Sequence, residues 1–456
     1  MWKQFLRTCR KIEDQTPDDR IRYADFLRVV AILVVVLGHW LLAYITVEDG
    51  QIQAERLLAI VPETQWLTWF FQVMPLFFFV GGLANAIGWD SSREKGTGYV
   101  NWLRKRAKRL LAPVIPLIFF WIPVVLLLNF LGTPTDLLVL ATQAVMLPIW
   151  FLAAYLCVIT ISPAAYWLHR RFGVGALLFF VAMALVVDIL HKAGVPYVGW
   201  SNFVWVWGAV HQAGFFWHDG RLPNSVARGV LIALVGYGLL LVLVLVFDYP
   251  LSMVGTGEAD RTNNSPPSIA LVVLTIGQIG LIIALKRPAE RLLQRTAVWG
   301  AVVLAGSRLM TVYLWHMTAM VAVAAAAYPT GLWPVADRVD GIWWLTRIPW
   351  LLLLTLTLII LVLAFGRFES PGPVKPTSIR GWPGRLKAIA GVALTTAGLA
   401  MLVAGGLYSE SSPLQLPWIP LVILITGLAG LGVVSLSAFR RGEEENAADR
   451  DQSSST

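Results

Sequence analysis

The chain has 456 residues, of which 57% are hydrophobic and only 14% are charged. Soluble domains carry about a quarter charged residues, so this composition excludes an ordinary water-soluble globule and indicates an integral membrane protein. The net charge of +9 comes from cations placed between apolar runs, which argues against a nucleic-acid partner, and two cysteines are too few for a disulfide framework or a multi-thiolate metal site.

Apolar stretches long enough to cross a bilayer recur along the whole chain. The hydrocarbon core is about 30 Å thick, so a spanning helix needs roughly 20 apolar residues. We predict twelve spans, and therefore an all-α polytopic bundle of about ten core helices followed by two C-terminal ones. The predicted spans are 26–46, 65–89, 111–131, 138–162, 173–192, 198–217, 227–247, 268–286, 308–327, 347–366, 386–408 and 417–438.

Lys and Arg are distributed unevenly between alternate loops. Of the 36 Lys and Arg residues, 31 fall on one side of the predicted membrane. The other five are Arg56, Lys192, Arg261, Arg338 and Arg347. Cytoplasmic loops carry an excess of Lys and Arg, so this distribution predicts a multi-pass protein of the cell membrane with both termini in the cytoplasm. It also favours an even number of spans.

Composition divides the chain into five segments. The Pro- and Gly-rich stretch before the last two spans is typical of a linker, and the acidic, then Ser-rich, C-terminus is typical of a disordered tail. The predicted segments are a cytoplasmic N-terminal segment (1–19), a main transmembrane domain (20–366), a cytoplasmic linker (367–385), an extra helix pair (386–438) and a disordered cytoplasmic tail (439–456).

The first span carries ionisable residues on one helical face. Arg28 and His39 are eleven residues apart, which is three turns plus about 20°, so both project from one face with roughly 16 Å of rise between them. Asp25, three residues before Arg28, lies on the same side. Ionisable groups inside a bilayer are costly and are therefore functional candidates.

Two interpretations of His39 stand side by side. Burial favours the neutral imidazole, which is the form that a general base needs. Alternatively, a buried histidine serves only as a hydrogen-bonding link between helices. The alignment with Arg28 favours the functional interpretation.

A basic cluster stands before the third span, where five of the six residues from Arg104 to Arg109 are Lys or Arg. The tendency of cytoplasmic loops to be basic explains most such clusters. A sharper interpretation is a phosphate clamp, because Arg106 and Arg109 are three residues apart and a guanidinium binds phosphate through two parallel hydrogen bonds. Charge alone does not decide between the two.

A second histidine candidate lies in the ninth span, where Tyr313 and His316 are spaced so that they meet on one helical face. Two other histidines, His211 and His218, are weaker candidates at the inner half and the end of the sixth span. His169 stands beside a pair of arginines, and we expect it to face water.

Residues Arg22 to His39 resemble the opening signature of the membrane-bound acyltransferase family 3. The resemblance covers about residues 20–366 and leaves out the last two spans. Residues 249–255 with 264–267 are similar to a subgroup common in actinobacteria. Four further segments resemble motifs of the family, namely Pro75–Gly82, Arg106–Arg109 with Pro113, Trp150–Leu152 and Ser307–His316.

The resemblance implies an O-acyltransferase with no tightly bound cofactor and no metal. The donor would be a cytoplasmic acyl-CoA, often acetyl-CoA, and the acceptor a hydroxyl of a glycan, a lipid or a glycosylated small molecule in contact with membrane lipids. His39 would deprotonate the acceptor or carry the acyl group transiently, Asp25 would orient Arg28, Arg28, Arg106 and Arg109 would hold the donor's phosphates, and Tyr313, His316 and Trp150 would line the cavity.

A proton-coupled secondary transporter of a small solute is the alternative. Twelve spans with both ends inside is a common transporter arrangement, and buried histidines can relay protons. Transporters often consist of two related halves, yet residues 1–220 and 227–438 show no convincing similarity, and the Arg28–His39 face has no counterpart in the second half. The sequence leaves the oligomeric state open.

Overall fold

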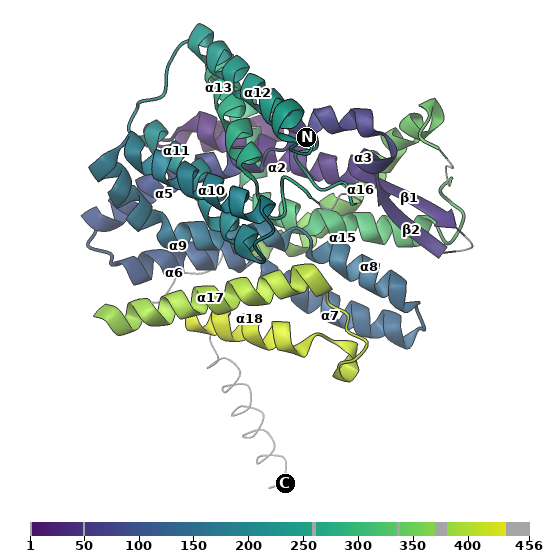
Figure 1. Ribbon diagram of the computed structural model, residues 1–456. Helices are drawn as coiled ribbons and strands as arrows, with labels where there is room; N and C mark the ends of the chain where they lie inside the picture. The colour runs from purple at the N-terminus through teal and green to yellow at the C-terminus, as the bar shows by residue number, and fades with distance from the viewer. Residues whose placement is uncertain (1, 49–50, 258–260, 335–337, 370–380, 435–456) are drawn as a thin grey trace. The chain divides into compact units, whose positions relative to one another are not determined.

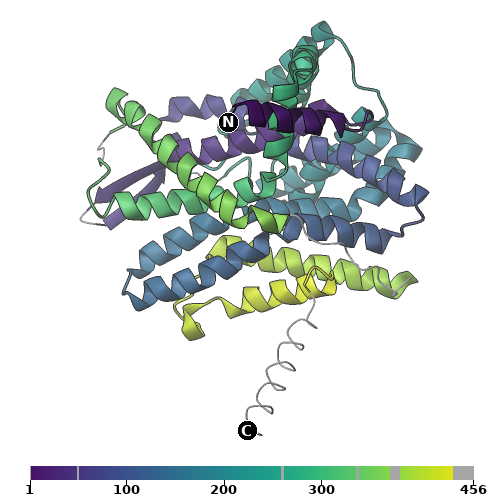
Figure 2. The same ribbon diagram turned by 180° about the vertical axis from the view of Figure 1, so that it is seen from behind.

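The computed structural model describes residues 2–48, 51–257, 261–334, 338–369 and 381–434. In this part of the chain nearly all regular structure is helical, apart from one antiparallel hairpin that is visible from both sides (Figures 1 and 2). Nine helices in the described ranges are long and apolar enough to cross a membrane, or ten if one bent pair forms a single span. The predicted all-α, multi-pass membrane architecture is confirmed.

The first of two compact units is drawn from residues 1–91 and 161–369. It contains the hairpin, β1 (Ala43–Glu48) and β2 (Gln51–Arg56), and short 3₁₀ turns at Pro62–Leu67, Val198–Ser201 and Gly366–Glu369. Its helices are α1 (Trp2–Asp14), α2 (Arg22–Leu42), α3 (Leu57–Ile60), α4 (Thr68–Phe71), α5 (Met74–Glu94), α10 (Val174–Lys192), α11 (Asn202–His218), α12 (Val226–Phe247), α13 (Ile269–Leu293), α14 (Thr296–Gly306), α15 (Leu309–Ala327) and α16 (Gly341–Phe365).

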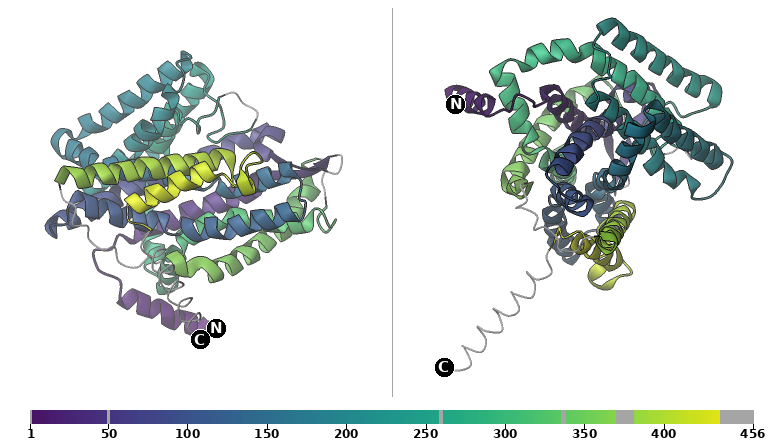
Figure 3. Two further views of the ribbon diagram at one scale, coloured as in Figure 1. Left: turned by 90° about the horizontal axis from the view of Figure 1, so that it is seen from below. Right: turned by 90° about the vertical axis from the view of Figure 1, so that its left-hand side faces the viewer.

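The second unit is drawn from residues 92–160 and from the chain after 369. It contains α6 (Tyr99–Leu111), α7 (Val114–Phe130), α8 (Thr135–Met146), the first half of α9 (Ile149–Phe172), α17 (Gly381–Gly405), a 3₁₀ turn at Pro413–Gln415 and α18 (Trp418–Gly430). Helices α17 and α18 lie side by side, as the left view of Figure 3 shows. Helix α17 also packs on α6 and α8.

Local sequence explains where several helices begin. Ser225, Ser268 and Asp340 each precede a helix, and each side chain accepts a hydrogen bond from a backbone N–H of the first turn of α12, α13 or α16. Such caps satisfy donors that have no partner within the helix. Helix α2 ends at Leu42, and the β-branched Ile45 and Thr46 that follow pair with β2.

The predicted spans overlap helices along most of the chain, but several bounds differ. Span 26–46 runs past the end of α2 into β1, and span 65–89 begins in the 3₁₀ turn before α4 and α5. Span 138–162 lies within Thr135–Phe172, which is apolar enough to cross a membrane as one stretch, although a short turn at Leu147 and Pro148 separates α8 from α9. Helix α14 occupies part of a predicted loop, and α18 is shorter than predicted. The domain boundaries stay a prediction, and most of the linker and the whole tail lie outside the described residues.

Helices α12 and α13 lie side by side (Figure 1), and glycines stand on their facing sides. A Cβ atom added at Gly236 would run into the backbone of Gly277, and one added at Gly280 into the backbone of Ala233. Small residues at such crossings let helix backbones approach closely, which is how helices associate inside a membrane.

We expect Gly236→Val to lower the thermal unfolding midpoint of the purified protein. Overpacking a close contact costs typically 1–3 kcal/mol. Gly238→Val is the matched control, because it lies on the same helix with nothing within 4 Å of an added Cβ. Equal midpoints for the two variants, measured in the same detergent, would show that the α12–α13 contact is not close.

Candidate active site

Helices α2 and α15 bring two histidines into direct contact. Nδ1 of His39 lies 2.7 Å from Nε2 of His316, and the two rings are stacked with their centroids 5.0 Å apart. Each histidine was a candidate by itself, and the structure shows that they form a pair.

The hydrogen bonds around the pair determine which nitrogens carry protons. Nδ1 of His316 lies 2.5 Å from the backbone carbonyl of Tyr313, and a carbonyl only accepts, so this nitrogen donates. Nε2 of His316 therefore holds a lone pair and accepts the hydrogen bond from Nδ1 of His39. In a neutral His39 the proton then resides on Nδ1, and Nε2 is the basic nitrogen.

The surroundings hold His316 more tightly than His39. The His316 side chain is 0% exposed, whereas His39 is only half-buried. The indole N–H of Trp40, the residue after His39, donates to the carbonyl oxygen of His316 over 3.0 Å. His39 is therefore the more exposed histidine of the pair, and His316 is enclosed by its neighbours.

Glu369 fixes the beginning of α15, the helix that carries His316. One carboxylate oxygen accepts from the backbone N–H of Met310 at 2.8 Å, and the other accepts from the N–H of Thr311 at 2.9 Å and from its hydroxyl at 2.6 Å. A carboxylate at a helix N-terminus stabilises the helix through the unpaired amides and the helix dipole.

The structure preserves one predicted relation on α2 and corrects another. Because α2 is continuous from Arg22 to Leu42, Arg28 and His39 keep their common face, and the Arg28 guanidinium lies over the ring of Phe77, 5.7 Å from its centroid. Asp25, however, forms its ion pair with Arg20 at 2.7 Å. The predicted orientation of Arg28 by Asp25 is wrong, because the carboxylate of Asp25 binds the guanidinium of Arg20, which precedes the helix.

The remaining predicted site residues belong to the second unit. Arg106 is half-buried above the ring of Trp102, 5.9 Å from its centroid, and Arg109 is exposed in the last turn of α6. Trp150 lies in the first turn of α9 and contacts the edge of Phe151. Their roles in donor binding and in lining a cavity stay predictions.

A second polar network, which sequence reasoning missed, surrounds His169. This side chain is 2% exposed, so the expectation that it faces water is wrong. Its Nε2 lies 3.1 Å from a carboxylate oxygen of Asp219, and its Nδ1 lies 3.2 Å from the amide nitrogen of Gln212. His218, the residue before Asp219, pairs with Asp90 at 2.9 Å. The carboxylates come from distant segments, so local sequence gave no signal.

Arg347 in α16 is the other residue whose environment the sequence analysis missed. Its side chain is 5% exposed and lies against the rings of Trp343 and Trp350, at 4.3 Å and 5.7 Å from their centroids. No carboxylate of the described residues pairs with it. The spacing of Trp343, Arg347 and Trp350 on one helical face was the available signal.

Comparison with known proteins identifies the family of this chain. A family model described as an acyltransferase domain matches residues 21–366. The chain belongs to acyltransferase family 3. The matched range begins just before α2 and ends just after α16, so it includes both histidines of the pair, and the predicted resemblance is confirmed. No curated protein and no solved structure matches.

Family membership makes this protein an acyl-transferring enzyme and argues against the transporter alternative. The similarity to the actinobacterial subgroup stays a prediction. Within the described ranges no group of three or more His, Cys, Asp or Glu side chains is arranged to hold a metal ion. Helices α17 and α18 lie outside the matched range.

Glu369→Gln should lower the unfolding midpoint of the acyltransferase, because the helix N-terminus loses its anion, an effect of about 1 kcal/mol. Glu290→Gln is the control, because it removes an exposed carboxylate that forms only a surface ion pair, 3.9 Å from Lys286. The comparison is made by thermal unfolding of the purified proteins. A larger loss in the control variant would contradict the assigned role of Glu369.

Proposed function

We propose that this chain is a multi-pass O-acyltransferase of the cell membrane, with both termini in the cytoplasm. It moves an acyl group, preferably acetyl, from cytoplasmic acyl-CoA to a hydroxyl of a glycan, a lipid or a glycosylated small molecule. The observation that carries the proposal is the hydrogen-bonded series from the Tyr313 carbonyl through His316 to His39. It leaves Nε2 of the more accessible histidine as a base within an acyltransferase domain.

In the proposed reaction, Nε2 of His39 takes the proton of the acceptor hydroxyl. The acceptor oxygen attacks the thioester carbonyl carbon, a carbon–oxygen bond forms and the carbon–sulfur bond breaks. The leaving thiolate takes the proton from His39, so the products are an ester and the free thiol of coenzyme A. While His39 is charged, its hydrogen bond to His316 is charge-assisted and therefore stronger, which stabilises the transition state.

The donor is proposed from the charges at the inner end of the helices. Arg28 lies on the same face of α2 as His39, roughly 16 Å below it by helix rise. A donor with phosphates at the membrane surface therefore needs a long flexible arm to present its thioester to His39, and the pantetheine arm of coenzyme A has this character. The sequence resemblance supports the same role for Arg106 and Arg109.

Replacing His39 tests the base. We expect His39→Gln to lower kcat by about 10²- to 10⁴-fold, the usual contribution of a general base, while the protein stays folded. His316→Gln should lower kcat less, because it disturbs only the position and tautomer of His39. Acyl transfer is measured with labelled acetyl-CoA and a membrane glycan extract as acceptor.

Tyr313→Phe is the matched control for these variants. The backbone carbonyl of Tyr313, and not its phenol, positions the histidine pair, so this variant should keep its kcat within about twofold. The predicted role of the Tyr313 side chain in lining the cavity would instead appear as a changed KM. Normal turnover in His39→Gln would refute the base. A labelled acyl group bound to His39 in the absence of acceptor would assign it as a transient carrier instead.

The donor-binding proposal predicts a different kinetic signature. Arg106→Gln and Arg109→Gln should raise KM for acyl-CoA, with a smaller change in kcat, because phosphate binding is equal in the ground state and in the transition state. Lys105→Gln removes an exposed charge from the same helix and should change neither constant. An unchanged KM in both arginine variants would remove Arg106 and Arg109 from the donor site.

A further inference from the structure

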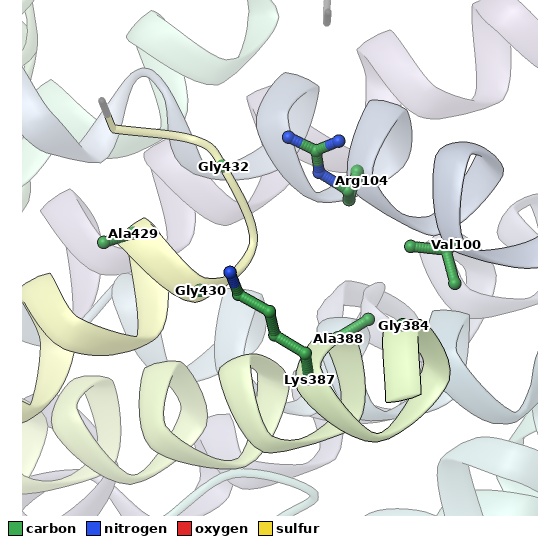
Figure 4. Close-up of a pocket in the computed structure, with 8 residues that line it drawn as sticks. All are labelled: Val100, Arg104, Gly384, Lys387, Ala388, Ala429, Gly430 and Gly432. Atoms are coloured by element: carbon green, nitrogen blue, oxygen red, sulfur yellow. The ribbon is translucent and has the colours of Figure 1, made fainter. Parts of the chain in front are cut away.

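The small cavity that Figure 4 shows lies within the second unit, with Arg104 and Lys387 on its walls. Its volume is about 70 Å³, whereas a pocket for a small-molecule ligand usually has roughly 300 Å³ or more. Neither histidine of the pair lines it. The acceptor of the proposed reaction therefore needs another place, close to His39.

The end of α2 that carries His39 meets a second segment of the chain. His39 lies in the last turn of α2, and β1 begins at Ala43, directly after the helix. Ala43 pairs with Arg56, the last residue of β2. Along the helix axis Ala43 lies about 6 Å beyond His39. The hairpin therefore places Arg56 opposite a position one helical turn beyond the histidine.

The guanidinium of Arg56 is fixed by the segment that follows α12. Its Nη1 donates to the carbonyl oxygen of Gly255 over 2.5 Å. A Cβ atom added at Gly255 would lie only 2.7 Å from the same nitrogen, so the guanidinium approaches the backbone at a position that has no side chain. One carbonyl cannot occupy all five N–H donors of a guanidinium, and Arg56 is exposed, so a ligand can reach it.

Contacts with α4 hold this segment in turn. The backbone N–H of Met253 donates to the hydroxyl of Thr68 over 2.9 Å, and the indole N–H of Trp69 donates to the carbonyl oxygen of Leu251 over 2.9 Å. Met253 itself is buried. Residues 249–255 therefore form a support that keeps the carbonyl that binds the guanidinium in one place.

His39 stands between two arginines along α2. Arg28 lies on the same helical face, roughly 16 Å before it. Arg56 lies beyond it, and its positive charge acts electrostatically on the His39 imidazole. From the distribution of Lys and Arg, Arg28 is expected toward the cytoplasm and Arg56 on the opposite side of the membrane. Two reactants can therefore approach the histidine from opposite ends, each guided by one cation.

We propose that Arg56 selects the acceptor, and that the acceptor carries a carboxylate or a phosphate beside its reactive hydroxyl. This inference rests on the proposed function, in which acyl-CoA occupies the Arg28 end of α2 and leaves the Arg56 end to the acceptor. A guanidinium binds either anion through parallel hydrogen bonds. Arg56 makes and breaks no covalent bond. The acceptor oxygen attacks the thioester carbon as before, and its proton passes through His39 to the leaving thiolate.

Octyl glucuronide and its neutral amide test the selection, because both offer the same hydroxyls and differ in the charge of one group. The full chain in nanodiscs should transfer labelled acetyl from acetyl-CoA to the acid with at least about tenfold higher kcat/KM than to the amide, since the amide lacks the charged hydrogen bond. Octyl glucoside 6-phosphate and its dimethyl ester form the corresponding pair for phosphate.

Variants of Arg56 separate selection from a structural role. Arg56→Gln should remove the preference for the acid by raising KM for the acceptor, while KM for acetyl-CoA stays within about twofold. Arg56→Lys keeps the charge and should keep part of the preference. Arg338→Gln is the matched control, because it removes a side chain that is 84% exposed on the same predicted side of the membrane, and it should keep the whole preference.

Thermal unfolding with each probe reports binding without transfer. The acid should raise the midpoint of wild type and of His39→Gln more than the amide does, and this difference should vanish in Arg56→Gln. The proposal is overturned if wild type treats the charged and neutral members of both pairs alike, or if Arg56→Gln keeps the preference. Charge-dependent binding without any acyl transfer would refute the proposed function instead. A preference confined to one pair identifies the anion as carboxylate or phosphate.

Discussion

The hydrogen bond between His39 and His316 is the interaction on which the rest of the account depends. An unpaired imidazole in a membrane interior is costly, and each ring satisfies the other across 2.7 Å. The bond needs α2 and α15 in contact, and the contact is supported by the indole of Trp40 on the carbonyl of His316 and by Glu369 at the beginning of α15. The same hydrogen bond leaves Nε2 of His39 as the basic nitrogen. Both the packing of the two helices and the proposed chemistry therefore require α2 and α15 to be in contact.

Hydrophobicity predicted the helical class of this protein because the bilayer imposes a length and a composition on each span. It failed where composition does not report geometry. Hydropathy gives no sign of the turn at Leu147 and Pro148 that separates α8 from α9 within the apolar stretch Thr135–Phe172. The strand pair after α2 also has no hydropathy signal, since Ala43–Glu48 and Gln51–Arg56 pair through backbone hydrogen bonds.

The site divides in a similar way. His39 and His316 were each predicted because an ionisable side chain inside an apolar run is unusual. Their contact joins positions that are 277 residues apart, and no local pattern contains that information. Helical spacing placed Asp25 on the side of Arg28, but Asp25 forms its ion pair with Arg20, which lies outside the helix. The spacing of residues along a helix predicts which side chains of that helix can meet. It does not predict which side chains from other segments bind them.

The tautomer of His39 is the most direct test of the central claim. Nitrogen NMR of the protein labelled at its histidines, in lipid bilayers near neutral pH, reports which ring nitrogens carry protons. The account predicts a protonated Nδ1 and an unprotonated Nε2 at His39, with a coupling across the hydrogen bond to Nε2 of His316. A proton on Nε2 of His39, or the absence of that coupling, would contradict it.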